Sequence, residues 1–275
     1  MKNTPIGIFD SGYGGLTVFR EIQKQLPQYD FIYLGDNARA PYGTRSFDTV
    51  YRYTLQCVKW FFEQKCPLVI LACNTASAKA LRTIQQDDLA IITKPEHRVL
   101  GVIRPTSETI GKLTKTKHIG LLATSGTVNS ESYPMEIEKY WPEARVYQQA
   151  CPMWVPLIEN NEFKTEGALY FFKKDLEKLF SQSKDIDTIL LGCTHYPILM
   201  DILKNLVPPS VKITSQDAIV AESLKDYLLR HGSMEEMISK NGSTQFYTTG
   251  SEQDFDIHAP LFFGQQIKSQ HIDLG

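Results

Sequence analysis

The sequence predicts an α/β protein made of two similar lobes, each a mainly parallel sheet flanked by helices, with the active site in the cleft between them. Short aliphatic runs without polar–apolar alternation indicate strands that are covered on both faces. These runs alternate with longer segments of helical periodicity, an order that builds parallel sheets. An internal duplication adds the second lobe and a pseudo-twofold axis.

Seven apolar runs are the predicted strands. In chain order they read IGIF (6–9), FIYL (31–34), LVILA (68–72), VLGVI (99–103), IGLLA (119–123), TILL (188–191) and VKI (211–213). Between them, apolar residues recur at helical spacing, most clearly in YRYTLQCVKWFFEQ. The predicted helices cover 15–26, 47–65, 75–86, 105–113, 130–140, 165–182, 197–206 and 217–231.

The duplication rests on two recurring features. IGIFDSG, which starts at Ile6, resembles IGLLATSG, which starts at Ile119 and has one extra residue. Later in each copy an aliphatic strand ends in a cysteine followed by a polar residue: LVILACNTAS contains Cys73 and TILLGCTHYP contains Cys193. The joint recurrence of strand, cysteine and helix start predicts two related lobes.

Composition and charge exclude several classes of protein. The chain has 275 residues, with 29 basic and 31 acidic side chains and a net charge of −2. It therefore lacks the positive field of a nucleic-acid-binding protein. The start, MKNTPIGIFDSG, has no apolar core of a secretion signal, and the longest apolar stretch, 68–73, is too short to span a membrane. We expect a cytoplasmic protein that binds neither nucleic acid nor membranes.

The cysteines indicate reduced thiols and no metal site. Their number is odd, their spacing is irregular and no CxxC pair occurs, which fits a reducing compartment. Cys193-Thr194-His195 offers two zinc-type ligands, but no spaced partner pair completes a tetrahedral site. Cys57, Cys66 and Cys151 are interpreted as small buried hydrophobic residues.

Cys73 and Cys193 occupy matching places at the carboxyl ends of predicted strands, where open α/β sheets bind ligands. Each precedes a predicted helix, with Thr75 and Thr194 as candidate N-caps and Pro197 in the first turn of the second. A helix start can bind a carboxylate and lower the pKa of a nearby thiol. Two such thiols facing one cleft would lie on opposite sides of a small anionic ligand.

Paired thiols on opposite sides of a ligand suit one reaction, the inversion of a stereocentre by proton exchange. One base removes the hydrogen from carbon, and an acid on the other face returns one. A thiolate and a thiol can do both and exchange roles in the reverse direction. The weakly acidic C–H bond also requires donors that stabilise a carbanion-like state away from water.

These motifs resemble those of bacterial glutamate racemases, the cofactor-independent members of the aspartate/glutamate racemase family. The similarity covers nearly the whole chain, and the paired CNTAS and GCTHYP motifs are its most specific part. Its segments are IGIFDSGYGGLTV from Ile6, YLGDNARAPYG from Tyr33, ACNTAS from Ala72, ACP from Ala150 with VPLIE from Val155, LGCTHYP from Leu191 and YTTG from Tyr247.

The resemblance implies a pyridoxal-free proton transfer that interconverts L- and D-glutamate and supplies D-glutamate for peptidoglycan. Cys73 would take the proton from D-glutamate and Cys193 from L-glutamate. Asp10 and His195 would assist the two thiols, with Asp36 and Glu159 as further supporting carboxylates. The implied substrate-binding pairs are Asp10-Ser11, Tyr42-Gly43, Asn74-Thr75 and Thr194-His195.

From the residues alone, several of these positions have simpler interpretations. Asp10-Ser11 and Tyr42-Gly43 are also typical of turns. Asp36 could satisfy loop amides, and Glu159, in the run ENNE, is typical of a solvated charge.

The resemblance also implies a discontinuous architecture. Residues 1–98 and 213–275 would form the first lobe, and residues 99–212 the second. A homodimer is expected, because dimers are common in the family. The sequence departs from the family pattern at Asn37, at Arg104 and in a longer segment over 87–97, all outside the core motifs.

Three other functions remain open. A racemase of a related acid, such as aspartate, hydantoin or an arylmalonate-type acid, would keep the fold and change the substrate. A two-lobed amino-acid binding protein would not need two matched thiols. A cysteine hydrolase would need one nucleophile with a separate histidine partner.

Overall fold

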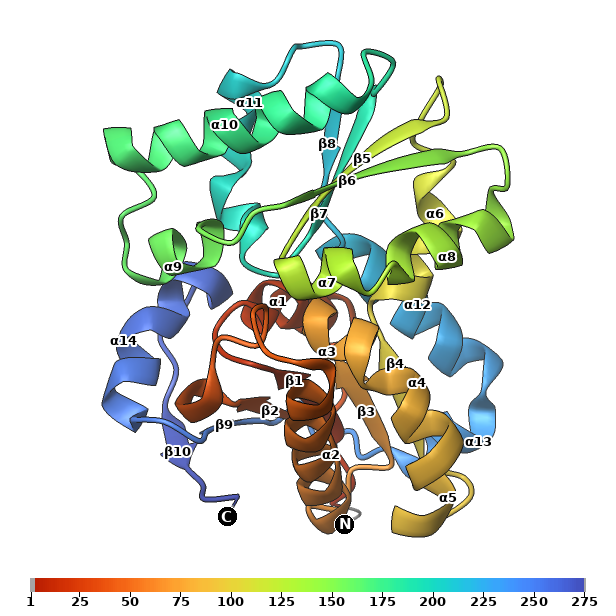
Figure 1. Cartoon of the computed structure of the whole chain (residues 1–275). Coiled ribbons are helices and arrows are strands. Elements are labelled where there is room, and N and C mark those ends of the chain that lie inside the picture. Colours follow the sequence, from red (N-terminus) through yellow and green to blue (C-terminus); the bar gives the residue numbers. More distant parts are fainter. Residues whose placement is uncertain (1–2, 275) are drawn as a thin grey trace.

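The computed structural model describes residues 3–274, which form two sheets stacked one above the other (Figure 1). The six-stranded sheet has the order β10-β9-β2-β1-β3-β4, and all its neighbouring strands are parallel. Its strands are β1 (Ile6–Asp10), β2 (Phe31–Gly35), β3 (Leu68–Leu71), β4 (Arg98–Gly101), β9 (Thr244–Thr248) and β10 (Ser269–His271).

The second sheet is four-stranded and parallel, with the order β6-β5-β7-β8. Its strands are β5 (His118–Ala123), β6 (Arg145–Ala150), β7 (Thr188–Gly192) and β8 (Lys212–Thr214). The predicted α/β class with two parallel, helix-flanked sheets is thereby confirmed.

The strand order reproduces the duplication seen in the sequence. β1 lies between β2 and β3 with β4 outside, and β5 lies between β6 and β7 with β8 outside. A 17-residue helix packs on the same side of each copy: α2 (Phe47–Glu63) and α10 (Glu166–Gln182). A Cβ at Gly7 would lie 2.6 Å from Phe61 of α2, and one at Gly120 would lie 2.8 Å from Leu179 of α10. A glycine in each central strand therefore allows the covering helix to pack closely against the sheet.

The remaining helices connect the strands or cover their faces. In the first half these are α1 (Gly15–Gln25), η1 (Asn37–Arg39), α3 (Asn74–Lys79), α4 (Leu81–Thr83), η2 (Ile84–Asp88), α5 (Leu89–Ile92), α6 (Ile103–Ile110), α7 (Ser125–Asn129) and α8 (Ser132–Tyr140). In the second half they are α9 (Trp154–Glu159), η3 (Tyr196–Leu199), α11 (Met200–Leu206), α12 (Asp217–Arg230), α13 (Gly232–Met237) and α14 (Glu252–Phe263). The short helices η1 and η3 are 3₁₀ turns, and η2 is a π-helix.

Helices α1, α3 and α7 lie at the junction of the two sheets (Figure 1). α1 packs against α12, and α3 packs against α7. Because α1 and α3 follow strands of the first sheet and α7 follows β5, this layer joins the ends of strands from both sheets. All the polar loops that follow β1, β3, β5 and β7 therefore point toward one region.

The sequence analysis did not predict three of the strands. β6 (RVYQQA), β9 (TQFYT) and β10 (SQH) are rich in polar residues and only partly buried. β6 and β10 are sheet edges with a neighbouring strand on one side only, and their partial burial requires no continuous apolar run. The predicted strand 99–103 is also too long, since α6 already begins at Ile103.

The lobe limits remain a prediction, but strand pairing refines them. Residues 99–101, expected in the second lobe, pair with β3 in the first sheet, and residues 213–214, expected in the first lobe, pair with β7 in the second. The sequence of an apolar strand does not indicate which sheet the strand joins. It therefore cannot show where the chain passes from one lobe to the other. Among residues 3–274, no helix has both the length and the apolar character to cross a bilayer.

Candidate active site

A cavity of about 70 Å³ lies between the two sheets and is lined by residues from both. At roughly 10–15 Å³ per water molecule, it suits a small ligand and excludes a polymer. From the first lobe it is lined by Ser11, Ala40, Pro41, Tyr42, Gly43, Thr44, Cys73, Asn74 and Thr75. From the second it is lined by Thr124, Ser125, Cys151, Pro152, Val155, Pro156, Glu159, Cys193, Thr194 and His195.

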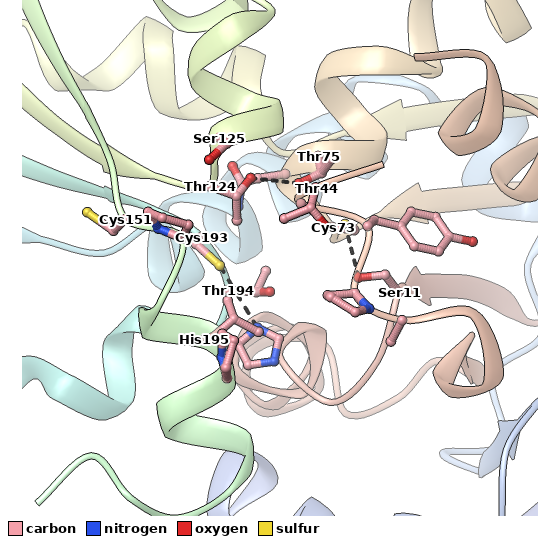
Figure 2. Close-up of a pocket in the computed structure, with 18 of the residues that line it drawn as sticks. Ser11, Thr44, Cys73, Thr75, Thr124, Ser125, Cys151, Cys193, Thr194 and His195 are labelled. Carbon is pink, nitrogen blue, oxygen red and sulfur yellow. Dashed lines mark hydrogen bonds between the residues drawn. The ribbon is translucent and has the colours of Figure 1, made fainter. Parts of the chain in front are cut away.

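The two matched cysteines lie on different walls of this cavity (Figure 2). Cys73 follows β3 of the first sheet, and Cys193 follows β7 of the second. Both side chains are buried, and a charge on either sulfur influences the other, since Cys193 is among the groups that raise the pKa of Cys73. The arrangement expected from the duplication therefore places both sulfurs around one enclosed space.

Cys73 itself caps the helix that follows it. Its Sγ accepts a hydrogen bond of 3.5 Å from the backbone N–H of Ala76, and the thiol lies 3.4 Å from Oγ of Ser11. Burial raises the pKa of Cys73 to about 12, with the nearby Asp10 carboxyl adding to the increase and the contacts with Ser11 and Ala76 opposing it. At neutral pH Cys73 is thus a protonated thiol.

Cys193 belongs to a chain of polar contacts that reaches a carboxylate. Its Sγ lies 3.9 Å from Nδ1 of His195, and Nε2 of the same ring lies 2.9 Å from Oε1 of Glu159. Burial by itself lowers the pKa of His195, but the hydrogen bonds with Cys193 and Glu159 outweigh it and raise the pKa to about 10. His195 is therefore an imidazolium at neutral pH, and its positive charge lies beside Sγ of Cys193.

Asp10 is fully buried behind the cavity wall and is not among its lining residues. Its Oδ2 accepts a 3.0 Å hydrogen bond from the N–H of Gly12, and its Oδ1 has no partner. Burial raises the pKa of Asp10, while the charge of His195 lowers it. Asp10 thus stands between the two thiol systems: it raises the pKa of Cys73 and interacts with His195.

Asn74 presents an unused donor to the cavity. Its Oδ1 accepts a 2.6 Å hydrogen bond from the hydroxyl of Tyr133, which fixes the direction of the amide. Its Nδ2 is buried and has no hydrogen-bond partner. Since a buried donor without a partner is costly, this N–H group is available to a bound ligand.

The predicted threonine caps are wrong, and the reason bears on the site. Cys73 provides the cap of α3, and His195 precedes η3 without a capping side chain. The hydroxyl of Thr75 instead lies 3.0 Å from that of Thr124 across the lobes (Figure 2), and Thr194 lines the cavity. Neither hydroxyl is therefore used in a helix start, and that of Thr75 bridges the two lobes.

The Tyr42-Gly43 loop closes one side of the cavity and crosses to the other lobe. The carbonyl of Gly43 accepts a 2.7 Å hydrogen bond from the N–H of Gly126. Asp36, which is fully buried, holds this loop from behind: it accepts from the Tyr42 hydroxyl, from Nε of Arg39 at 2.7 Å and from Thr249 at 2.7 Å. Asp36 does not line the cavity.

The match with a family model settles the class of this protein. The model described as Asp/Glu/hydantoin racemase matches residues 6–222, which include both cysteine loops, the whole four-stranded sheet and strands β1 to β4 of the six-stranded sheet. The chain belongs to this racemase family. Members of the family work without pyridoxal phosphate.

Relatives of this racemase match it from end to end. A glutamate racemase of Streptococcus gordonii is 38% identical over all of both chains, and one of Sulfurihydrogenibium is 38% identical over 98% of this chain and 97% of its own.

Solved structures agree with these relatives. A crystal structure of a Bacillus anthracis glutamate racemase has a TM-score of 0.89 at 34% identity, covering 100% of this chain and 99% of the other. That of the Francisella tularensis enzyme, determined with D-glutamate, has a TM-score of 0.87 at 30% identity and the same coverage.

Of the twelve residues that the sequence analysis assigned to this racemase's site, ten line the cavity, and Asp10 and Asp36 support it from behind. The analysis missed the lining residues Ala40, Pro41, Thr44, Thr124, Ser125, Cys151, Pro152, Val155 and Pro156. The duplication held a signal for two of these, because Thr124-Ser125 in the second copy occupies the place of Asp10-Ser11 in the first.

Cys151 differs from the other two thiols in the racemase cavity. Its Sγ lies 3.5 Å from the carbonyl of Gln149, and Figure 2 shows it turned away from Cys193. Burial raises the pKa of Cys151 well above its ordinary value, so it is a neutral thiol. All five cysteines are free and buried, and within residues 3–274 no group of three His, Cys, Asp or Glu side chains is placed to hold a metal ion.

Proposed function

We propose that this racemase interconverts L- and D-glutamate by proton transfer between substrate and two cysteines, without a cofactor. The observation that carries the proposal is the pair Cys73 and Cys193, which line a single cavity from opposite sheets. The choice of glutamate is supported by relatives named glutamate racemases that are 34–38% identical over nearly all of both chains.

In the direction from L- to D-glutamate, the thiolate of Cys193 takes the α-proton and the carbon gains a carbanion-like electron pair. The thiol of Cys73 then gives its proton to the opposite face. One C–H bond breaks and one forms, and the two sulfurs have exchanged protonation states. The reverse reaction starts with Cys73 as the base.

The electrostatic environment of each sulfur supports these starting states. The His195 imidazolium, held by Glu159, places a positive charge 3.9 Å from Sγ of Cys193. The raised pKa of Cys73 keeps its proton available for transfer. Asp10, buried beside Cys73, favours the return of a proton to that sulfur when the direction is reversed.

The carboxylates of glutamate require several hydrogen-bond donors. The cavity offers the unpartnered Nδ2 of Asn74 and the hydroxyls of Ser11, Thr75, Thr124 and Thr194. We propose that these groups bind the two carboxylates and orient the α-carbon between the sulfurs. Fixed donors of this kind also stabilise negative charge that develops during proton removal.

The enzyme would serve in the cytoplasm, where D-glutamate enters peptidoglycan precursors, and would act as a homodimer. Aspartate is the alternative substrate. Solved structures of an aspartate racemase and a homologue share the fold at 16% and 17% identity, which carries no information on substrate. The full-length glutamate racemase relatives favour glutamate over it. A binding protein without catalysis would not explain two opposed thiols with separate acid–base partners.

Solvent exchange tests the proposal directly. In D₂O without pyridoxal phosphate, L-glutamate is expected to convert to D-glutamate that carries deuterium at the α-carbon, as followed by NMR and chiral chromatography. L-Aspartate, L-glutamine and L-alanine serve as comparison substrates. Racemisation without deuterium uptake would overturn the mechanism, and equal rates on all four amino acids would overturn the specificity.

A further inference from the structure

The first turn of α1 carries a contact between lobes that the proposed mechanism does not use. Thr17 is buried, and its Oγ1 lies 2.9 Å from the carbonyl of Thr194 and 2.9 Å from that of Gly14. Its single hydroxyl proton can serve either carbonyl. Thr17 belongs to the first lobe, whereas Thr194 directly follows Cys193 in the second.

Gly14 brings the same turn even closer to the loop Cys193–His195. A Cβ at Gly14 would lie 2.3 Å from Nδ1 of His195 and 2.4 Å from Oγ1 of Thr194. Gly14 has φ −57° and ψ −38°, a conformation that every residue adopts readily. Glycine is therefore required here for space and not for its conformational freedom.

We propose that Gly14 and Thr17 are positioning residues that seat the loop Cys193–His195 against the first lobe. Thr17 fixes the carbonyl of Thr194, and Gly14 lets the His195 ring reach the face of α1. Neither residue touches the cavity, so both act through the loop. The inference rests on the proposed function only for its kinetic consequence.

The position of the loop Cys193–His195 matters because a single ring, that of His195, makes two contacts at once. The ring must face Cys193 with Nδ1 and Glu159 with Nε2, at 3.9 Å and 2.9 Å. A shift of the loop would change both contacts together, whereas Cys73, on the other wall, keeps its own contacts with Ser11 and Ala76. Loss of these contacts to the loop should thus affect Cys193 and not Cys73.

Thr17→Val removes the hydroxyl and keeps the shape of the side chain, and Thr17→Ser keeps the hydroxyl. The matched control is Thr54→Val, since Thr54 is equally buried but its hydroxyl bonds only the carbonyl of Val50 in its own helix, at 2.7 Å. We expect Thr17→Val to lower kcat about tenfold or more, because misplaced reacting groups cost up to about 100-fold. Thr17→Ser should restore most of that loss.

A second readout separates positioning from a general loss of structure. The purified variants are treated with iodoacetamide, and the rates of modification of Cys73 and Cys193 are measured by peptide mass spectrometry. Thr17→Val should change the ratio of the two rates at least threefold, while Thr17→Ser and Thr54→Val should leave it unchanged. The basic limb of the pH profile should also move in Thr17→Val alone.

The outcomes are decisive in either direction. A Thr17→Val enzyme with the control's kcat and an unchanged modification ratio overturns the inference. If that variant does not fold, Gly14→Ala tests the same seat by crowding it, and an unchanged ratio there has the same consequence. If the wild-type protein does not racemise glutamate, the proposed function fails, while the modification ratio still decides the role of Thr17.

Discussion

Oε1 of Glu159 lies 2.9 Å from Nε2 of His195, at the end of helix α9 and the start of η3. This contact joins two segments that are 36 residues apart and makes a buried imidazole strongly basic. It also separates the two thiols chemically, because the hydrogen-bond partners of Cys73 are instead the neutral Ser11 and Ala76 N–H, and its charged neighbour is the Asp10 carboxyl.

Glu159→Gln should lower the pKa of His195 from its value of about 10. A hydrogen bond to a charged group contributes about 1.5–3 kcal/mol, and about 1.4 kcal/mol corresponds to one pH unit. Because activity requires the imidazolium in the proposed mechanism, the fall in kcat/KM on the basic side should move about one pH unit or more toward neutrality. The measurement is kcat/KM between pH 7 and 11.

The same variant has a consequence for stability. The pKa of His195 is raised in the folded protein above its ordinary value of 6.5, so the stability it contributes is complete below pH 6.5 and is lost as the pH rises through about 10. In Glu159→Gln this loss should be complete at a lower pH. Glu162→Gln, a change at an exposed residue just after helix α9, is the control. A basic limb that stays in place would contradict the role of Glu159.

Cys73→Ala and Cys193→Ala should each abolish racemisation in both directions. Each turnover needs one sulfur as base and the other as acid, and a positioned acid or base accounts for about 10²–10⁴-fold in rate. Racemisation is measured by circular dichroism, and folding by thermal melting. Cys66→Ala is the control, because Cys66 is buried but does not line the cavity. Near-normal turnover in either single variant would disprove the two-thiol mechanism.

The central strands and both cysteines could be predicted because their physical signals are local. A parallel strand buried on both faces needs a continuous apolar run, as in LVIL of β3 and TILL of β7. The polar strands β6 and β9 obtain their order from neighbours far along the chain, so a local pattern does not reveal them.

The site shows the same division between local and distant signals. Cys73 and Cys193 were found from repeated motifs, and the family resemblance added the partners of each. That Asp36 supports the cavity from behind depends on contacts with Tyr42 and with Thr249, the latter 213 residues away. No spacing in the sequence encodes such contacts, because they arise when β2 and β9 pair.

Asp36→Asn should destabilise the protein and weaken substrate binding more than it slows chemistry. Asp36 loses its charge beside Arg39, a change we expect to cost about 1–3 kcal/mol in the free energy of unfolding. The loop with Tyr42 loses its anchor, so KM should rise more than kcat falls. Urea denaturation and steady-state kinetics measure the two effects.

Asp48→Asn is the matched control for this change. Asp48 pairs with Arg52 at 3.1 Å, but both side chains are mostly exposed, and such pairs contribute about 0–1 kcal/mol. A stability change in Asp36→Asn no larger than in this control would mean that the buried contacts of Asp36 do not hold the loop.

Gly7→Ala should lower stability by about 1–3 kcal/mol, the usual cost of overpacking a core. The added methyl would lie 2.6 Å from Cδ1 of Phe61, on the helix that covers β1. Adding Phe61→Leu to the variant makes room and should recover part of the loss, as measured by urea denaturation. If the two changes simply add, the close approach of α2 to β1 is not what requires a glycine.

Helix α3 is sensitive to the charge on the sulfur that caps it. In the proposed cycle Cys73 alternates between thiol and thiolate, and a charged sulfur is the stronger acceptor for the Ala76 N–H. The opening residues of α3, Asn74 and Thr75, also face the ligand. Loss of the proton from Cys73 therefore strengthens the hydrogen bond at the start of α3, and its return weakens that bond. The spectroscopic signal of the Ala76 amide should report whether the proton is on Cys73.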